Sequence, residues 1–80
     1  MKLLMKMSLD KLPINNIGYI DSVNCSNNIK KRLLDLGLVK NTAIKPLFTS
    51  ISNNPIAYLI RGSVIALRLE DSKNINIYLK

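Results

Sequence analysis

The segment from Lys31 to Val39 encodes a helix together with its stop signal, and it constrains the fold more than any other part of the chain. Its apolar residues and one that precedes it recur at helical spacing: Ile29, Leu33, Leu34 and Leu36. Gly37 follows at the point where a chain leaving a helix often takes a positive φ, which costs glycine least. With Gly37 at C′ of a Schellman ending, Leu38 should contact Leu33. We therefore predict a two-turn helix over residues 29–36, capped within residues 26–28 and held by packing.

Chain length and cysteine content limit the class of protein. The chain has 80 residues, one cysteine and no histidine. This length predicts a single domain over residues 1–80, with residues 1–7 as a loose or strand-like lead-in. One cysteine excludes an intrachain disulfide, and without histidine the usual zinc sites lack ligands. No segment approaches the roughly 20 apolar residues of a membrane span. We expect a cytoplasmic protein without a metal or cofactor.

Short segments of alternating or continuous apolar character predict strands along the rest of the chain. They cover residues 19–25, 43–48, 56–60, 64–69 and 75–79. Residues 8–13 predict one helical turn, capped by Ser8, with Leu9 and Leu12 in the core. Residues 64–69 are apolar on both faces, which predicts a central strand. The predicted fold is mainly β, a five-stranded small barrel with one short helix after the first strand.

The sequence offers little material for catalysis. Without histidine, the commonest general base is missing. Glu70 and Asp71 are the only adjacent acids, and they fall in a predicted turn or helix start. Cys25 is more simply a small buried hydrophobe than a reactive thiol, because its neighbours carry no charge. We expect a protein that is not an enzyme, with no catalytic residues.

The formal net charge is +7, yet the basic residues are scattered except for Lys30-Lys31-Arg32. On the predicted helix these three lie opposite Ile29, Leu33 and Leu36. They form either a solvated face, with Lys31 and Asp35 able to pair, or a docking patch for an acidic partner, a phosphate or a lipid headgroup. Arg61 at a hairpin tip and Arg68 after it could extend such a patch.

The positive charge also allows a small-barrel protein that binds nucleic acid. Such barrels usually stack bases on exposed aromatic side chains. The aromatic residues of this chain alternate with core-type neighbours and are expected to be buried or half-buried: Tyr19, Phe48, Tyr58 and Tyr78. This pattern disfavours nucleic-acid binding, which we keep as the alternative function.

Three stretches of the chain resemble the FeoA family of bacterial ferrous iron transport. They are residues 8–13 with Gly18, residues 31–39, and the late segments 54–56, 61–62 and 65–68. The resemblance implies an SH3-like barrel and a non-catalytic accessory protein that docks on the cytosolic part of FeoB, the membrane Fe(II) transporter. It places the protein in the cytoplasm, at the inner face of the membrane through its partner. The chain departs from the family at Lys40-Asn41, where Pro-Gly is usual, and at Asn54, where Asp is common.

These inferences define the candidate residues. Residues expected to bind the partner are Lys30, Lys31, Arg32 and Arg61. Residues expected to form the structural motif are Leu33, Leu36, Gly37 and Leu38. In this reading Ile29, Leu33 and Leu36 hold the helix on the barrel, while the basic residues face the transporter. The oligomeric state, including a homo-oligomer, stays open.

Overall fold

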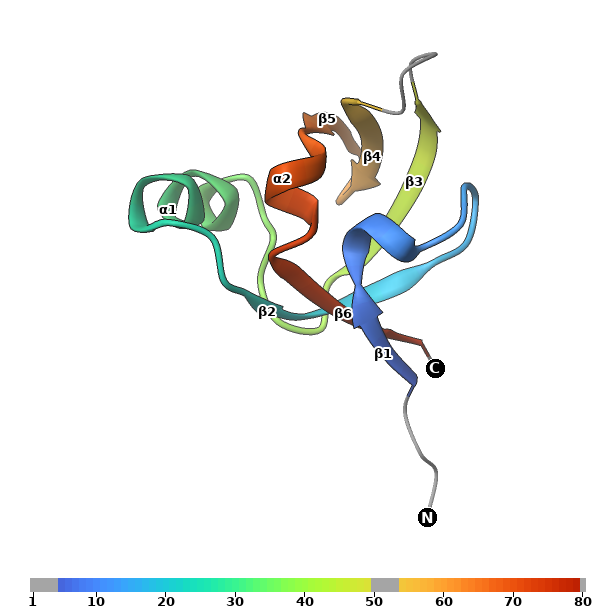
Figure 1. Ribbon diagram of the computed structural model, residues 1–80, viewed down its shortest axis with the longest axis horizontal. Helices are drawn as coiled ribbons and strands as arrows, with labels where there is room; N and C mark the ends of the chain where they lie inside the picture. Colours follow the sequence, from blue (N-terminus) through green and yellow to red (C-terminus); the bar gives the residue numbers. More distant parts are fainter. Residues whose placement is uncertain (1–4, 50–53, 80) are drawn as a thin grey trace.

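The computed structural model describes residues 5–49 and 54–79, which build one antiparallel sheet in the order β1-β6-β2-β3-β4-β5 (Figure 1). The elements in chain order are β1 (Met5–Ser8), η1 (Leu9–Lys11), β2 (Gly18–Val23), α1 (Asn27–Asp35), β3 (Ala43–Thr49), β4 (Ile56–Ile60), β5 (Ser63–Leu67), α2 (Leu69–Ser72) and β6 (Ile75–Leu79). The predicted mainly β fold is confirmed. β1, part of the expected lead-in, adds a sixth strand by pairing with β6, and residues 1–4 lie outside the described ranges.

One apolar core joins the sheet to η1 and α1. Its fully buried members include Leu9 of η1, Leu33 of α1 and Ile77 of β6. Leu9 and Leu12 enter this core as predicted, and each buried leucine contributes roughly 1.5–3 kcal/mol. The expected Ser8 cap is wrong, because its side chain makes no capping hydrogen bond.

The simple alternation predicted for the first long strand is interrupted. The register between β2 and β6 shifts between Ile20 and Ser22, as in a β-bulge. Because the bulge changes which side chains face inward, Ile20 and Val23 are both buried although they are three positions apart, a spacing that puts side chains on opposite faces of a regular strand. Strict alternation along the strand predicted over residues 19–25 is therefore wrong.

The hairpin between β4 and β5 has a two-residue loop. Its residues Arg61 and Gly62 have φ values of 51° and 80°, and positive φ at both loop positions is the type I′ pattern. The strand that follows, β5, was predicted to be central. This prediction is wrong, because β5 lies at the edge of the sheet. Val64 is 57% exposed, and Leu69 already belongs to α2. This segment is apolar on both faces for two reasons: the outward face of β5 carries exposed apolar side chains, and the last residue of the segment belongs to α2 and not to the strand.

The loop from α1 to β3 is fixed by Asn41, which stands where the FeoA family usually has glycine. Asn41 has a positive φ, 71°. Its side-chain Oδ1 accepts a hydrogen bond of 2.6 Å from the hydroxyl of Tyr78. Tyr78 in turn stacks on Tyr19, with ring centroids 5.6 Å apart. These contacts tie the helix exit to the centre of the sheet.

Tyr58 brings a hydroxyl into the core. The residue is fully buried, and within the described ranges its hydroxyl has no hydrogen bond of good geometry. Burial raises the pKa of Tyr58 above its usual value of 10.0; the neighbouring Ser72 hydroxyl lowers it, and the Asp10 carboxylate raises it further. The folded protein therefore holds this phenol in its neutral form beyond pH 10.

We predict a loss of stability in alkaline solution that depends on this phenol. Above about pH 10 unfolded Tyr58 loses its proton while the folded residue keeps it, so the free energy of unfolding falls as pH rises through that range. Tyr58→Phe should change stability by less than about 1 kcal/mol at pH 7, because it removes an unsatisfied hydroxyl. It should also flatten the decline above pH 10. Urea unfolding at pH 7, 10 and 11 measures both effects, and an unchanged alkaline slope would contradict the assignment to Tyr58.

Candidate partner-binding surface

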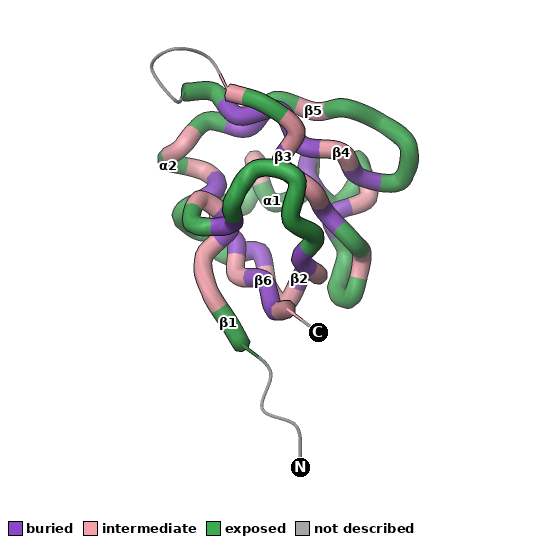
Figure 2. Tube along the Cα trace, turned by 90° about the vertical axis from the view of Figure 1, so that its right-hand side faces the viewer, coloured by how far each residue is buried: buried purple, intermediate pink, exposed green. Residues whose placement is uncertain are grey.

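α1 presents its basic side chains to solvent. Lys30, Lys31 and Arg32 are all exposed, whereas Leu33 is fully buried and Ile29 is half-buried. Figure 2 shows the helix as mostly exposed surface. The anticipated pairing of Lys31 with Asp35 is absent from the described residues, whose ion pairs are Lys6–Asp21 and Arg68–Glu70. The positive charge of this surface is therefore not neutralised by an ion pair on the helix.

The end of α1 has the predicted Schellman geometry. The N–H of Leu38 donates to the carbonyl of Leu33 at 3.0 Å, and the N–H of Gly37 donates to that of Leu34 at 3.0 Å. Gly37 has φ of 104°, and Leu33 and Leu38 are both fully buried in the same core. The sequence signal for the stop is confirmed in its backbone pattern and in its apolar members.

Arg61 lies against the helix exit, although it is far from α1 in the sequence. A Cβ added to Gly37 would lie 2.8 Å from Cδ of Arg61, which is closer than side chains normally approach. The absence of a side chain at Gly37 thus gives room for the arginine as well as for the positive φ. The structure brings Arg61 to the C-terminal end of the helix that carries Lys30, Lys31 and Arg32.

The helix exit also exposes three apolar side chains, two of which the helical spacing assigned to the buried face. Leu34 and Leu36 are 41% and 44% exposed, and Val39 is exposed as well. The prediction that Leu36 holds the helix on the barrel is wrong, because the helix ends at Asp35 and Leu36 is its C-cap. We call the combined area the helix-exit surface, formed by Lys30, Lys31, Arg32, Leu34, Leu36, Val39 and Arg61. Sequence spacing alone gave no signal for its apolar part.

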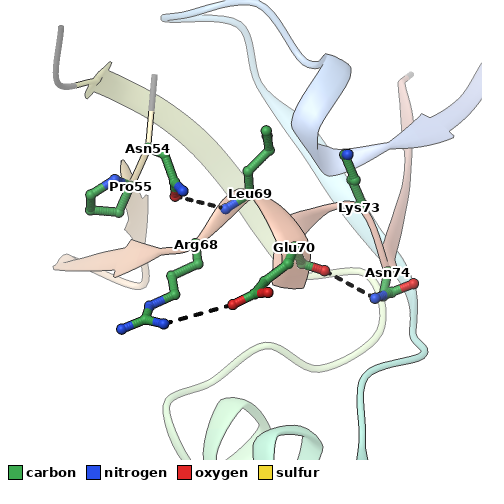
Figure 3. A pocket seen from close by; sticks show the side chains of 7 residues that line it. All are labelled: Asn54, Pro55, Arg68, Leu69, Glu70, Lys73 and Asn74. Atoms are coloured by element: carbon green, nitrogen blue, oxygen red, sulfur yellow. Dashed lines mark hydrogen bonds and ion pairs between the residues drawn. The ribbon is translucent and has the colours of Figure 1, made fainter. Parts of the chain in front are cut away.

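A hollow of about 710 Å³ lies beside α2 (Figure 3). It is lined by Asn54, Pro55, Arg68, Leu69, Glu70, Lys73 and Asn74. Arg68 lies 3.7 Å from Glu70, and the side chain of Asn54 accepts a 3.0 Å hydrogen bond from the N–H of Leu69. Arg68 therefore faces a carboxylate of its own, and the suggestion that it extends the basic helix surface gains no support.

Cys25 is half-buried beside the core. Its thiol lies 3.5 Å from the carbonyl oxygen of Asp71, toward which it donates. Burial raises the pKa of this thiol above its usual value of 9.0, and the negative charge of Asp71 adds to the rise. The thiol is therefore protonated at neutral pH, which agrees with a packing role.

The described part of the chain contains neither a metal-binding cluster nor a helix that could span a membrane. Over residues 5–49 and 54–79, no cluster of three or more histidine, cysteine, aspartate or glutamate side chains could hold a metal ion. Within the same ranges, no helix has the length and apolar character needed to cross a bilayer.

Comparison with known proteins gives a consistent family assignment. Residues 7–79 match the model of the FeoA domain. The chain is 30% identical over 73 residues to a Campylobacter jejuni protein named Fe(2+) transport protein A, covering 91% of this chain and 99% of the relative.

Two solved structures extend the comparison. The FeoA protein of Chlorobium tepidum superposes with a TM-score of 0.88 at 26% identity, covering 91% of this chain and 70% of that one. The zinc complex of Stenotrophomonas maltophilia FeoA, described as a prokaryotic SH3 domain protein, gives 0.79 at 25% identity, covering 89% and 88%. The predicted SH3-like fold is thereby confirmed, and the chain belongs to the FeoA family.

Proposed function

We propose that this protein is a non-catalytic accessory protein of bacterial Fe(II) uptake, which docks on the cytosolic part of a FeoB-type transporter. The observation that carries the proposal is the helix-exit surface on a chain of the FeoA family, which combines exposed cations with exposed apolar side chains. The relative named Fe(2+) transport protein A supports the connection with iron uptake. The protein then works in the cytoplasm, at the inner face of the membrane through its partner.

The composition of the surface supports docking more than solvation alone. Leu34, Leu36 and Val39 expose apolar area next to one another in sequence, and Arg61 adds an aliphatic stem with a charged end. Contiguous apolar area rimmed by charge is typical of protein interfaces. The lysines would speed encounter with an acidic surface, and the apolar side chains would slow dissociation.

Charge reversal on α1 tests the proposal. Lys31→Glu with Arg32→Glu should weaken binding to the purified transporter of the same organism by about tenfold or more, equivalent to about 1.4 kcal/mol. The matched control is Lys11→Glu with Lys73→Glu, which changes the net charge equally at exposed positions on other elements. Biolayer interferometry with the transporter in nanodiscs measures both variants. Equal weakening by both would mean that net charge, not this surface, directs binding.

Nucleic-acid binding is the alternative, and it rests on the net charge of +7. Of the aromatic residues, Tyr58 and Tyr78 are buried and Tyr19 is half-buried, whereas Phe48 is 63% exposed, contrary to prediction. One exposed ring gives only a minimal stacking platform. Titration of a labelled oligonucleotide over a salt series separates the alternatives, because phosphate contacts weaken steeply with salt.

A further inference from the structure

β5 leaves one edge of the sheet unpaired within the described part of the chain. In an antiparallel hairpin closed by a two-residue loop, alternate residues bond the partner strand, beginning with the closing pair, here Ile60 and Ser63. Val64 and Ala66 therefore turn their N–H and C=O groups away from β4, and both residues are exposed. The edge thus offers donors and acceptors spaced to receive another strand.

This edge lacks the devices that usually block strand addition. Natural edge strands carry lysine, proline, a bulge or an inward charge. The opposite edge strand, β1, carries Lys6, which lies 3.7 Å from Asp21. Residues 63–67 contain no charge and no proline, and their register with β4 has no shift. The absence of such protection at β5 is specific to this side of the sheet.

The outer face beside the edge is largely apolar. Two cross-strand rows end at β5: Lys45–Leu59–Val64 and Phe48–Ala57–Ala66. Phe48 and Val64 are among the most exposed large apolar residues of the described chain. A shallow apolar hollow of about 180 Å³, lined by Ile17, Lys45, Leu59 and Arg61 among others, continues the first row. A strand added to β5 would extend both rows by one side chain each.

The part of the sequence that forms β3, β4 and β5 carries only basic charges. Between Asp35 and Glu70 the sequence contains no acidic residue, while it carries Lys40, Lys45, Arg61 and Arg68. This stretch includes β3, β4 and β5. Arg61 and Arg68 lie within two residues of the two ends of β5. Arg68 pairs with Glu70 at 3.7 Å, but both side chains are largely exposed, so a carboxylate of an added segment can compete for this arginine and carboxylates at both ends of the segment match the edge.

We propose that the β5 edge binds an extended acidic segment of a partner protein by strand addition. Pairing with a second copy of the chain is disfavoured, because antiparallel contact of two β5 strands brings Arg61 of one copy near Arg68 of the other. Nucleic acid is disfavoured because phosphate oxygens only accept hydrogen bonds and cannot satisfy the outward carbonyls of Val64 and Ala66. This edge shares Arg61 with the helix-exit surface but does not include Lys30, Lys31 or Arg32, and the proposal holds whether or not the partner is a transporter.

Amide hydrogen exchange on the full chain tests the proposal with a defined probe. The probe is the peptide acetyl-Asp-Glu-Val-Thr-Val-Thr-Val-Glu-Asp-amide, and its control carries lysine at each acidic position. At ten times its Kd the acidic peptide should slow exchange of the Val64 and Ala66 amides about tenfold, since only the free protein leaves them open. The lysine peptide should leave both rates unchanged.

A backbone variant tests the same edge by binding affinity. Val64→Pro removes an outward N–H without removing a hydrogen bond to β4. It should therefore weaken binding of the acidic peptide about tenfold or more, whereas Val64→Thr should retain binding. Should Val64→Pro fail to fold, the exchange rates of the wild-type protein decide alone. The proposal is overturned by absent protection at Val64 and Ala66, by equal binding of the lysine peptide, or by equal protection from a single-stranded thymidine oligonucleotide. Protection that appears on raising protein concentration without peptide would assign the edge to a second copy instead.

Discussion

Leu33→Ala is expected to lower the free energy of unfolding by about 2–5 kcal/mol, because it truncates a fully buried side chain and leaves a cavity. Leu33 is the one fully buried residue of α1, and its carbonyl also accepts the hydrogen bond that closes the helix. A domain of 80 residues has a total stability of only about 4–12 kcal/mol. The variant should therefore lose a large part of its stability, measured by urea unfolding followed by circular dichroism.

Leu34→Ala is the matched control. It removes the same side chain from the adjacent position of the same helix, but Leu34 is 41% exposed. We expect a change of less than about 1 kcal/mol, since surface substitutions rarely exceed that size. Similar losses in both variants would mean that Leu34 is also buried, and would contradict the orientation of α1. Binding of Leu34→Ala to the transporter then reports on the helix-exit surface without a folding defect.

The helix α1 shows how much of the structure sequence periodicity predicts. The spacing of its leucines and the position of Gly37 predicted the element, its end and the Leu33–Leu38 contact. The same spacing predicted that Leu36 is in the core, but in the structure its side chain is 44% exposed. Periodicity places residues around a helix axis but does not say how wide a stripe the barrel covers. That width depends on how far α1 projects from the sheet, a tertiary property.

The strands show a similar division. The positions of β3, β4 and β6 follow from local pattern, and a hairpin tip was expected at Arg61. The edge position of β5 was not expected, because an exposed apolar face and a buried apolar face have the same sequence pattern. The bulge in β2 likewise depends on the register with β6. Pairing partners that lie far apart in the sequence decide both features.

The candidate surface combines local and non-local contributions. Lys30, Lys31 and Arg32 were predicted to be exposed from the helix pattern alone, and they are. The position of Arg61 against Gly37 depends on the β4–β5 hairpin reaching the helix exit, which no local pattern encodes. Sequence reasoning therefore identified the cations but could not join them into one surface.

Gly37→Ala tests that junction, and we expect it to lower the free energy of unfolding by about 2–3 kcal/mol. An L residue at φ of 104° is strained, at a cost of roughly 1–2 kcal/mol for left-handed backbone. The new Cβ would also meet Cδ of Arg61 at 2.8 Å, so the arginine must move or the helix end must shift. Thermal and urea unfolding of the variant measure the sum of the two effects.

A double-mutant cycle with Arg61→Ala separates strain from crowding. Alanine is the suitable replacement at position 61 because glycine would also relieve the positive φ of 51° there. If crowding contributes, the loss in Gly37→Ala with Arg61→Ala should be smaller than the sum of the single losses by about 0.5–1 kcal/mol. Strict additivity would mean that Arg61 moves aside freely and that Gly37 is required for its backbone conformation alone. In the coupled case, Gly37 both ends the helix and leaves room for Arg61 at the helix exit, so one backbone position shapes the fold and the proposed docking surface together.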